Sequence, residues 1–122
     1  MLYTFPESPL PARPAMTESN QIQLKKGALE LCVLALLAHR ESYAYEIAGT
    51  LAAGVDMGEG TIYPLMRRMQ NDGLVDTRLV ESNSGPPRKY YRLTSSGRAA
   101  FVAQKREWRA FTDRVDQLLG ET

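Results

Sequence analysis

The chain has 122 residues and a formal net charge of +1, and 43% of its residues are hydrophobic. This length and composition are ordinary for a globular protein and predict one domain with a single modest core. The only cysteine, Cys32, excludes an intramolecular disulfide and a cysteine-built metal site within one chain, and no apolar stretch is long enough to span a membrane.

Residues 1–20 contain four of the seven prolines and show no periodicity, so we expect a mobile tail. The first residues, MLYTFPESPLPARPAM, lack the basic segment of a signal peptide and contain too many prolines for one. We therefore expect a cytoplasmic protein without a membrane partner.

The first predicted helix covers residues 24–39 and is apolar on most of its circumference, which is typical of a helix buried on several sides. Cys32 lies in it and is expected to be buried as a small hydrophobic residue. A second helix is predicted from about Tyr43 to Ala53, with Ser42 as its N-cap and a break at Gly54.

A third helix is predicted from about Glu59 to Asp72, closed by Gly73. Pro64 is tolerated only near the first turn of such a helix, where backbone N–H groups lack partners in any case. Its inner face is predicted to consist of Ile62, Leu65, Met66 and Met69.

Residues 74–81 and 88–93 alternate as β-strands do, and the turn cluster SNSGPP between them predicts a hairpin. Thr94 or Ser95 caps a final helix that reaches about Leu118. The order is mainly α (α+β) and predicts a winged helix-turn-helix domain over residues 21–94, with a two-stranded β wing. A long C-terminal dimerisation helix is expected over residues 95–122.

The third helix has the character of a DNA-recognition helix. Its first half is small at Gly60 and Thr61 and carries the hydroxyl of Tyr63, so it is suited to the major groove. Arg67 follows one turn after Tyr63 and is expected to face DNA. Arg68 lies about 100° away on the helical wheel and is expected to reach a phosphate or an intramolecular carboxylate.

A second basic group, RKYYR, occupies residues 88–92 in the hairpin, and Lys25 and Lys26 form a third at the start of the first helix. Between residues 61 and 93 there are six basic and three acidic residues, so this module carries +3 while the whole chain carries +1. An isolated arginine pair is usually a solvated helix face. The concentration of charge in one module instead favours a DNA-binding face.

The segments GEGTIYPLMRRMQNDGLV and ESNSGPPRKYYRLTSSGR resemble the PadR-type transcription regulators, and the resemblance covers roughly residues 24–100. It implies a homodimeric repressor of the subgroup with a short C-terminal helix, which binds an inverted repeat and is often released by a small molecule. Two departures are Gly58, where the family commonly has Ser or Thr, and Ala44, where it commonly has Gly.

The resemblance also implies that Tyr43 and Tyr45 approach the DNA backbone, although core packing is an equal alternative for Tyr43. The residues expected to bind DNA are Lys25, Lys26, Tyr43, Tyr45, Gly60, Thr61, Tyr63, Pro64, Arg67, Arg68, Arg88, Lys89 and Tyr90.

The last helix would be about 36 Å long, more than the small core can cover. Its apolar residues recur at three- and four-residue steps, with only Gln104 polar among them, as in a coiled coil. A homodimer would cover this seam, which consists of Phe101, Trp108, Phe111, Val115 and Leu118. Trp108 is either plain interface core or the lining of a site for a flat aromatic or drug-like effector.

An enzyme is not expected, because the only histidine, His39, has no nucleophile at a recognisable spacing. No metal cluster or phosphate-binding glycine loop is present, so no cofactor is expected. The stronger rival to a DNA-binding regulator is a winged helix that binds an acidic protein through its basic hairpin.

Overall fold

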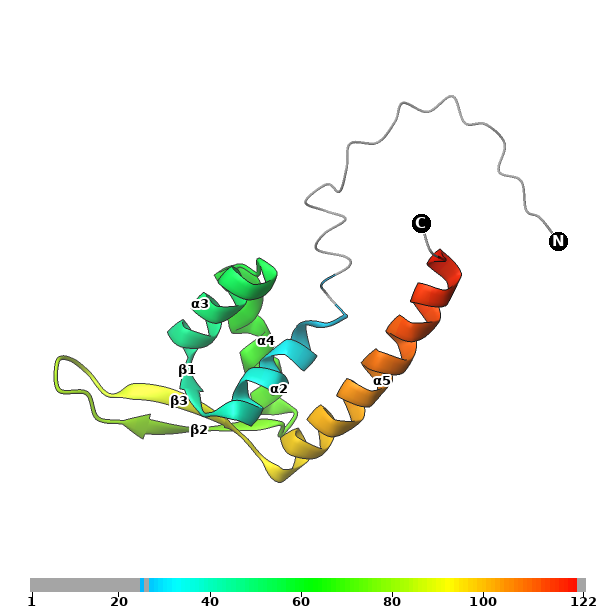
Figure 1. Ribbon diagram of the computed structural model, residues 1–122. Helices are drawn as coiled ribbons and strands as arrows, with labels where there is room; N and C mark the ends of the chain where they lie inside the picture. The colour runs from blue at the N-terminus through cyan, green and yellow to red at the C-terminus, as the bar shows by residue number, and fades with distance from the viewer. Residues whose placement is uncertain (1–24, 26, 121–122) are drawn as a thin grey trace, which may run out of the picture.

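The computed structural model describes residue 25 and residues 27–120, and these contain four helices and a three-stranded antiparallel sheet (Figure 1). The elements are α2 (Leu29–His39), β1 (Ser42–Tyr43), α3 (Ala44–Val55), α4 (Glu59–Asn71), β2 (Val75–Val80), β3 (Arg88–Leu93) and α5 (Ser95–Leu119). This confirms the predicted mainly α winged-helix order. The tail expected over residues 1–20 lies outside the described residues.

Helix α2 lies at the centre of the molecule, between the α3–α4 pair and α5 (Figure 1). The helix predicted over residues 24–39 is interrupted: Lys25 is helical, Gly27 and Ala28 form a turn, and α2 begins at Leu29. Val33 and Leu34 are fully buried, as expected for a helix that is apolar on several sides. Cys32 is only half-buried, and burial raises the pKa of its thiol.

Helix α3 starts differently from the prediction. Ser42 is not its N-cap; Ser42 and Tyr43 are extended and pair with Tyr91 and Tyr90 of β3. Tyr43 occupies the N-cap position, and its backbone N–H donates to Glu46 Oε1 at 3.4 Å. The extended segment gains ladder hydrogen bonds with β3, which a local Ser42 cap would forgo.

The far end of α3 also differs, because the helix passes through Gly54 and stops at Asp56. Asp56 adopts the left-handed conformation with φ 55°, a backbone region that aspartate tolerates better than most residues. Gly54 was predicted to break the helix, and this prediction is wrong.

Helix α4 matches its predicted inner face, since Ile62, Leu65, Met66 and Met69 are all buried. Gly73 follows the C-cap with φ 77°, as the predicted helix end requires. Pro64, however, is the sixth residue of α4 and so lies in the second turn, deeper than expected. The helix remains continuous there, and the residue four positions earlier, whose carbonyl would clash with the proline ring, is the exposed Gly60 near the helix start.

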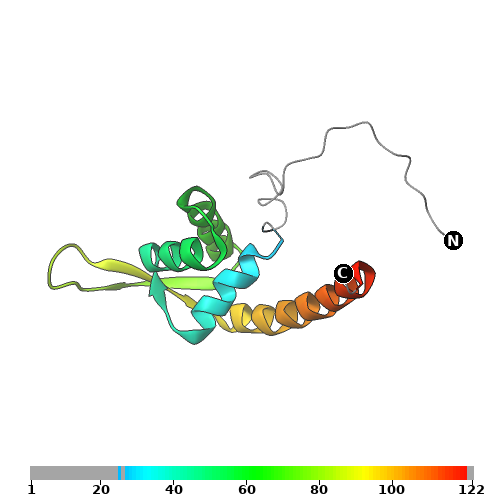
Figure 2. The same cartoon turned by 45° about the horizontal axis from the view of Figure 1, so that its top comes forward.

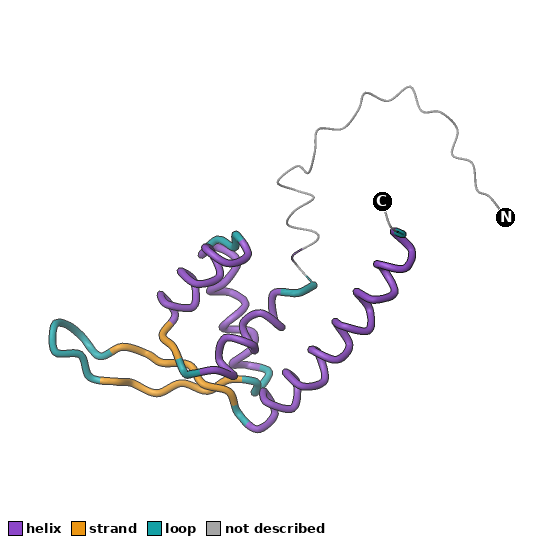
Figure 3. Tube along the Cα trace, viewed as in Figure 1, coloured by secondary structure: helices purple, strands orange, loops and turns teal. Residues whose placement is uncertain are grey.

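The sheet has the order β1-β3-β2, and β2 and β3 form a hairpin that projects away from the helices (Figure 3). We call this hairpin, residues 75–93, the wing. Val75, Tyr91 and Leu93 are buried at its base, whereas Leu79 nearer the tip is 71% exposed. The two-stranded wing is as predicted, and β1 adds a short third strand at its base.

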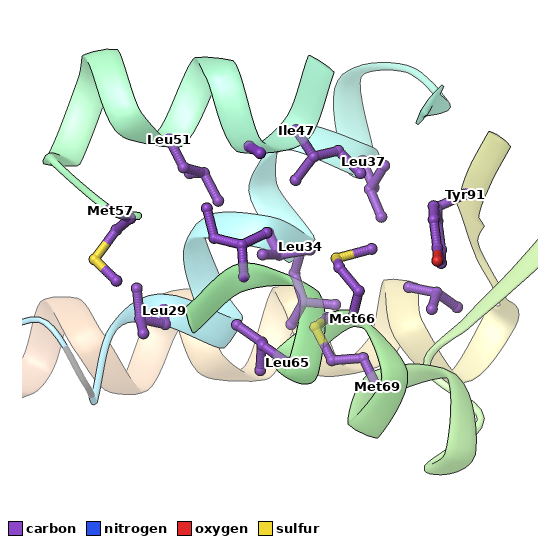
Figure 4. Packing of buried hydrophobic residues seen from close by; sticks show 14 of the residues in the cluster. Leu29, Leu34, Leu37, Ile47, Leu51, Met57, Leu65, Met66, Met69 and Tyr91 are labelled. Carbon is purple, nitrogen blue, oxygen red and sulfur yellow. The ribbon is translucent and has the colours of Figure 1, made fainter. Parts of the chain in front are cut away.

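The core lies among α2, α3, α4 and the base of the sheet (Figure 4). Leu34 of α2 lies between Ile47 of α3 and Met66 of α4, and Tyr91 closes the core on the side of the sheet. The core thus fixes α4 with one face inward and leaves its opposite face at the surface.

Helix α5 begins at the base of the sheet and runs away from it on the side opposite the wing (Figure 2). Of the two predicted caps, Thr94 is the one used: the Thr94 hydroxyl accepts from the Gly97 N–H at 3.0 Å and donates to the Gly73 carbonyl at 2.6 Å. The first half of α5 packs on α2, and its C-terminal half stands apart from the rest of the described chain (Figure 1).

Candidate nucleic-acid interface

The outward face of α4 carries a stripe of four residues at four- and three-residue steps. Gly60, Pro64, Arg67 and Asn71 lie on the side of the helix opposite its buried residues, and all four are exposed. We call these residues the outer stripe. Two small residues at its start leave room for a close approach, and a guanidinium follows one turn later.

The outer stripe is flanked by Tyr63 on one side and by Thr61 and Arg68 on the other. Tyr63 is 37% exposed. Arg68 makes an ion pair of 3.6 Å with Glu30 of α2, which agrees with one of its two predicted partners, an intramolecular carboxylate. Arg67 takes part in none of the ion pairs found among the described residues.

A group of aromatic rings joins the start of α3 to the wing. The Tyr43 ring stacks on Tyr45 with 6.4 Å between centroids and lies 5.4 Å from the Tyr90 ring. The Arg88 guanidinium lies over the Tyr43 ring, 4.7 Å from its centroid. Tyr43 is half-buried in this group, outside the main core cluster, and Tyr45 is 69% exposed. Tyr43 is therefore packed against other side chains, as the alternative of core packing requires, but it does not belong to the main core.

The basic side chains of the wing fall into two sets. Arg92 Nε is 2.6 Å from Asp76 Oδ1 on the neighbouring strand, and Arg78 pairs with Glu41. The hydrogen bond from Arg78 holds the pKa of the Glu41 carboxyl below its usual value. Arg88 and Lys89 instead lie over tyrosine rings and join no ion pair in the described part of the chain. Only these two leave their charge open to an external anion.

Lys25, which was expected to bind DNA, has a partner within the chain. Its Nζ lies 3.2 Å from the backbone carbonyl oxygen of Asp56 and 3.5 Å from the Asp56 carboxylate. A cation there is favoured by the dipole at the C-terminus of α3. Lys26 lies outside the described residues.

The structure therefore brings the α4, Tyr43, Tyr45 and wing residues of the predicted site into adjacent elements, whereas Lys25 is engaged at the end of α3. Asn71 was missed by sequence reasoning, although its four-residue step from Arg67 was the signal that could have placed it on the outer stripe. Glu30 was also missed, because a partner for Arg68 on another helix leaves no mark in the local pattern.

The predicted seam on α5 is largely at the surface. Trp108, Phe111 and Leu118 are 40%, 60% and 88% exposed, while Phe101 and Val115 are half-buried. Trp108 borders an open cavity of about 360 Å³ with Leu31 of α2 and Gln104. A second cavity of about 420 Å³ also borders Trp108 and includes His39.

Residue 25 and residues 27–120 were searched for a metal site and for a membrane-spanning helix. No group of three or more metal-binding side chains gathers in this part of the chain. No helix in it is both long and apolar enough to cross a membrane.

Comparison with known proteins gives consistent similarities. Residues 33–103 match the transcriptional regulator PadR-like family. A transcriptional regulator of Mycobacterium tuberculosis is 31% identical over 101 residues, which cover 80% of this chain and 89% of that protein. A PadR-like transcriptional regulator from Bacillus cereus is 37% identical, with 82% and 99% of the two chains covered and a TM-score of 0.74. A PadR family regulator from Eggerthella lenta is 33% identical, with 85% and 92% covered and a TM-score of 0.74.

Proposed function

We propose that this chain, which belongs to the PadR-like family of transcriptional regulators, represses transcription as a homodimer bound to an inverted repeat in duplex DNA. A small molecule releases it from this site. Membership of a family of transcriptional regulators agrees with the prediction that the chain is not an enzyme.

The observation that carries the proposal is the outer stripe of α4. It is exposed along its length, and Arg67 in it takes part in no ion pair among the described residues. The start of α4 is narrow enough to enter the major groove. A guanidinium beside it that has no counterion among the described residues is suited to bind guanine edges or phosphates. Helix α4 therefore enters the major groove in this proposal, with Gly60, Thr61 and Pro64 closest to the bases.

The wing and the start of α3 supply contacts to the DNA backbone. Arg88 and Lys89 have open charges, and the wing projects from the same domain as α4 (Figure 1). Such side chains reach phosphates or the minor groove beside a recognition helix. Tyr45 and Tyr90 belong to the aromatic group that joins the start of α3 to the wing, and their hydroxyls are donors for phosphate oxygens.

The seam on α5 supports the homodimer. Trp108, Phe111 and Leu118 would present an unusual apolar surface in a monomer, and a two-fold pair of α5 helices covers it. A two-fold dimer also matches an inverted repeat, because each α4 then meets one half-site about one helical turn from the other. The cavities beside Trp108 are the proposed place for a flat aromatic effector.

The proposal is tested by fluorescence anisotropy with duplexes taken from the promoter of the chain's own gene. We expect specific binding that weakens steeply with salt. Arg67→Ala should lose about five- to 150-fold in affinity, because a well-placed arginine–base contact contributes ~1–3 kcal/mol.

The matched control is Arg106→Ala, which removes the same charge from an exposed position on α5, on the side away from the seam. It should leave affinity nearly unchanged. If Arg67→Ala and Lys89→Ala both bind promoter DNA like the unaltered chain, the recognition assignment is wrong. Absence of any sequence preference would instead favour the winged helix as a protein-binding module.

A further inference from the structure

Glu30, in the first turn of α2, contacts two other helices, one through each carboxylate oxygen. Its Oε2 accepts a hydrogen bond of 2.7 Å from the side-chain amide of Gln104 on α5. Its Oε1 lies 3.6 Å from the guanidinium of Arg68 on α4. The Glu30 side chain is 25% exposed, and that of Arg68 is 62% exposed. A single, mostly buried carboxylate thus connects α5 to α4.

Gln104 occupies the other end of this connection. It borders the cavity of about 360 Å³ beside Trp108, together with Leu31 and Glu107. Gln104 is also the one polar residue among the apolar positions of the α5 seam. A ligand in the cavity or a second helix on the seam would therefore lie next to the amide that donates to Glu30.

Arg68 is adjacent to Arg67 but about 100° further around α4, on the flank of the outer stripe that contacts α2. Its exposure leaves the guanidinium accessible to a second anion. While Glu30 offsets its charge, Arg68 contributes less to the attraction of a phosphate than Arg67 does.

We propose that Glu30 is a positioning residue that withholds Arg68 from DNA, and that Gln104 strengthens this restraint. The inference rests on the proposed function, since it concerns how α4 binds DNA. A carboxylate already held by Gln104 loses less side-chain freedom when it pairs with Arg68, so the pair is stronger. Displacement of Gln104 therefore weakens the Glu30–Arg68 pair and makes Arg68 more available to DNA.

The first test is Glu30→Gln, which preserves the size of the side chain and its hydrogen bonding to Gln104 but removes the carboxylate charge. We expect promoter DNA to bind about two- to fivefold more tightly, the range set by a partly exposed ion pair. The salt dependence should steepen by about one phosphate contact, because Arg68 now neutralises one. In an Arg68→Ala background, Glu30→Gln should change neither quantity.

The second test is Gln104→Leu, which should act in the same direction as Glu30→Gln but more weakly, and only while Arg68 and Glu30 are both present. Glu107→Gln is the matched control, because Glu107 borders the same cavity but joins no ion pair in the described part of the chain. It should leave the salt dependence unchanged. Sedimentation of each variant checks that oligomeric state is constant across the series.

A measurement without DNA completes the test. In nitrogen-edited NMR spectra, the guanidinium signal of Arg68 should shift in both Glu30→Gln and Gln104→Leu, and that of Arg67 should not. Equal effects of Glu30→Gln with and without Arg68 would overturn the inference while the DNA-binding function stands. If the unaltered chain shows no sequence-specific DNA binding, the proposed function is overturned, and the inference with it.

Discussion

Gly97, in the first turn of α5, is the residue at which the fold requires the absence of a side chain. A Cβ built there would overlap the backbone carbonyl oxygen of Leu74 and lie 3.2 Å from the Leu93 side chain. The start of α5 therefore packs directly against the chain between α4 and β2. Thr94 holds the same junction through its hydrogen bonds to Gly73 and Gly97. This contact sets where α5 leaves the winged-helix domain.

Gly97→Ala should destabilise the protein. The overlap is with backbone rather than with a flexible side chain, so α5 must shift as a whole. We expect a loss of about 1–3 kcal/mol in the free energy of unfolding, as for other overpacked sites, measured by urea denaturation followed by circular dichroism.

Gly49→Ala is the matched control for this substitution. Gly49 is exposed on α3, and a Cβ there would have no neighbour within 4 Å. Its replacement should raise stability by about 0.5–1 kcal/mol through helix propensity alone. Equal stability of the two variants would show that α5 does not need the close approach at Gly97.

At the scale of elements, the short strand β1 connects α3 to the wing. Its two residues pair with β3, and the Tyr43 side chain carries the contact further, to Tyr90 and Arg88. An isolated two-stranded hairpin is marginally stable in water, so the wing depends on such contacts at its base. Tyr43 thus holds Arg88 at a defined distance from α3.

Tyr43→Ala and Tyr43→Phe separate the two roles considered for this residue. Loss of the ring should free Arg88 and weaken DNA binding about two- to fivefold, the range of a partly exposed cation–π contact. Tyr43→Phe keeps the ring and should bind DNA nearly as the unaltered chain does. Amide hydrogen exchange should be faster over residues 88–93 in the alanine variant only. Equal losses of affinity in both variants would assign the contact to the hydroxyl.

At the scale of the whole molecule, the wing and α5 extend in opposite directions from one small core (Figure 2). The core covers only the first half of α5, where Phe101 packs against it. Beyond it, Trp108, Phe111 and Leu118 lie at the surface. The parts of the chain proposed for DNA and for the second subunit are therefore separated, and Glu30 is a physical connection between their helices.

Trp108→Arg should shift the protein from dimer to monomer in sedimentation velocity. A charge at the centre of an apolar seam would be buried without a partner in a dimer. Val102→Arg is the matched control, because Val102 is 56% exposed on α5 but lies away from the seam. It should leave the dimer intact. A dimer that persists in Trp108→Arg would place the subunit interface elsewhere than on α5.

Features that are encoded within single elements could be predicted from the sequence alone. The inner face of α4, the strands β2 and β3 and the Thr94 cap of α5 each follow from periodicity or from a local turn. The basic character of the wing also follows from the sequence, because it depends on residue types alone.

The partners of those charges, by contrast, depend on how the whole chain folds. Lys25 meets Asp56 across 31 positions and Gln104 meets Glu30 across 74, separations at which no local pattern operates. The strand β1 has only two residues, so no periodicity in the sequence could predict it. Its pairing with β3 replaced the helix cap that was predicted at Ser42. Partners such as these are selected by packing of the whole chain around α2, because packing alone brings distant side chains within a few ångströms.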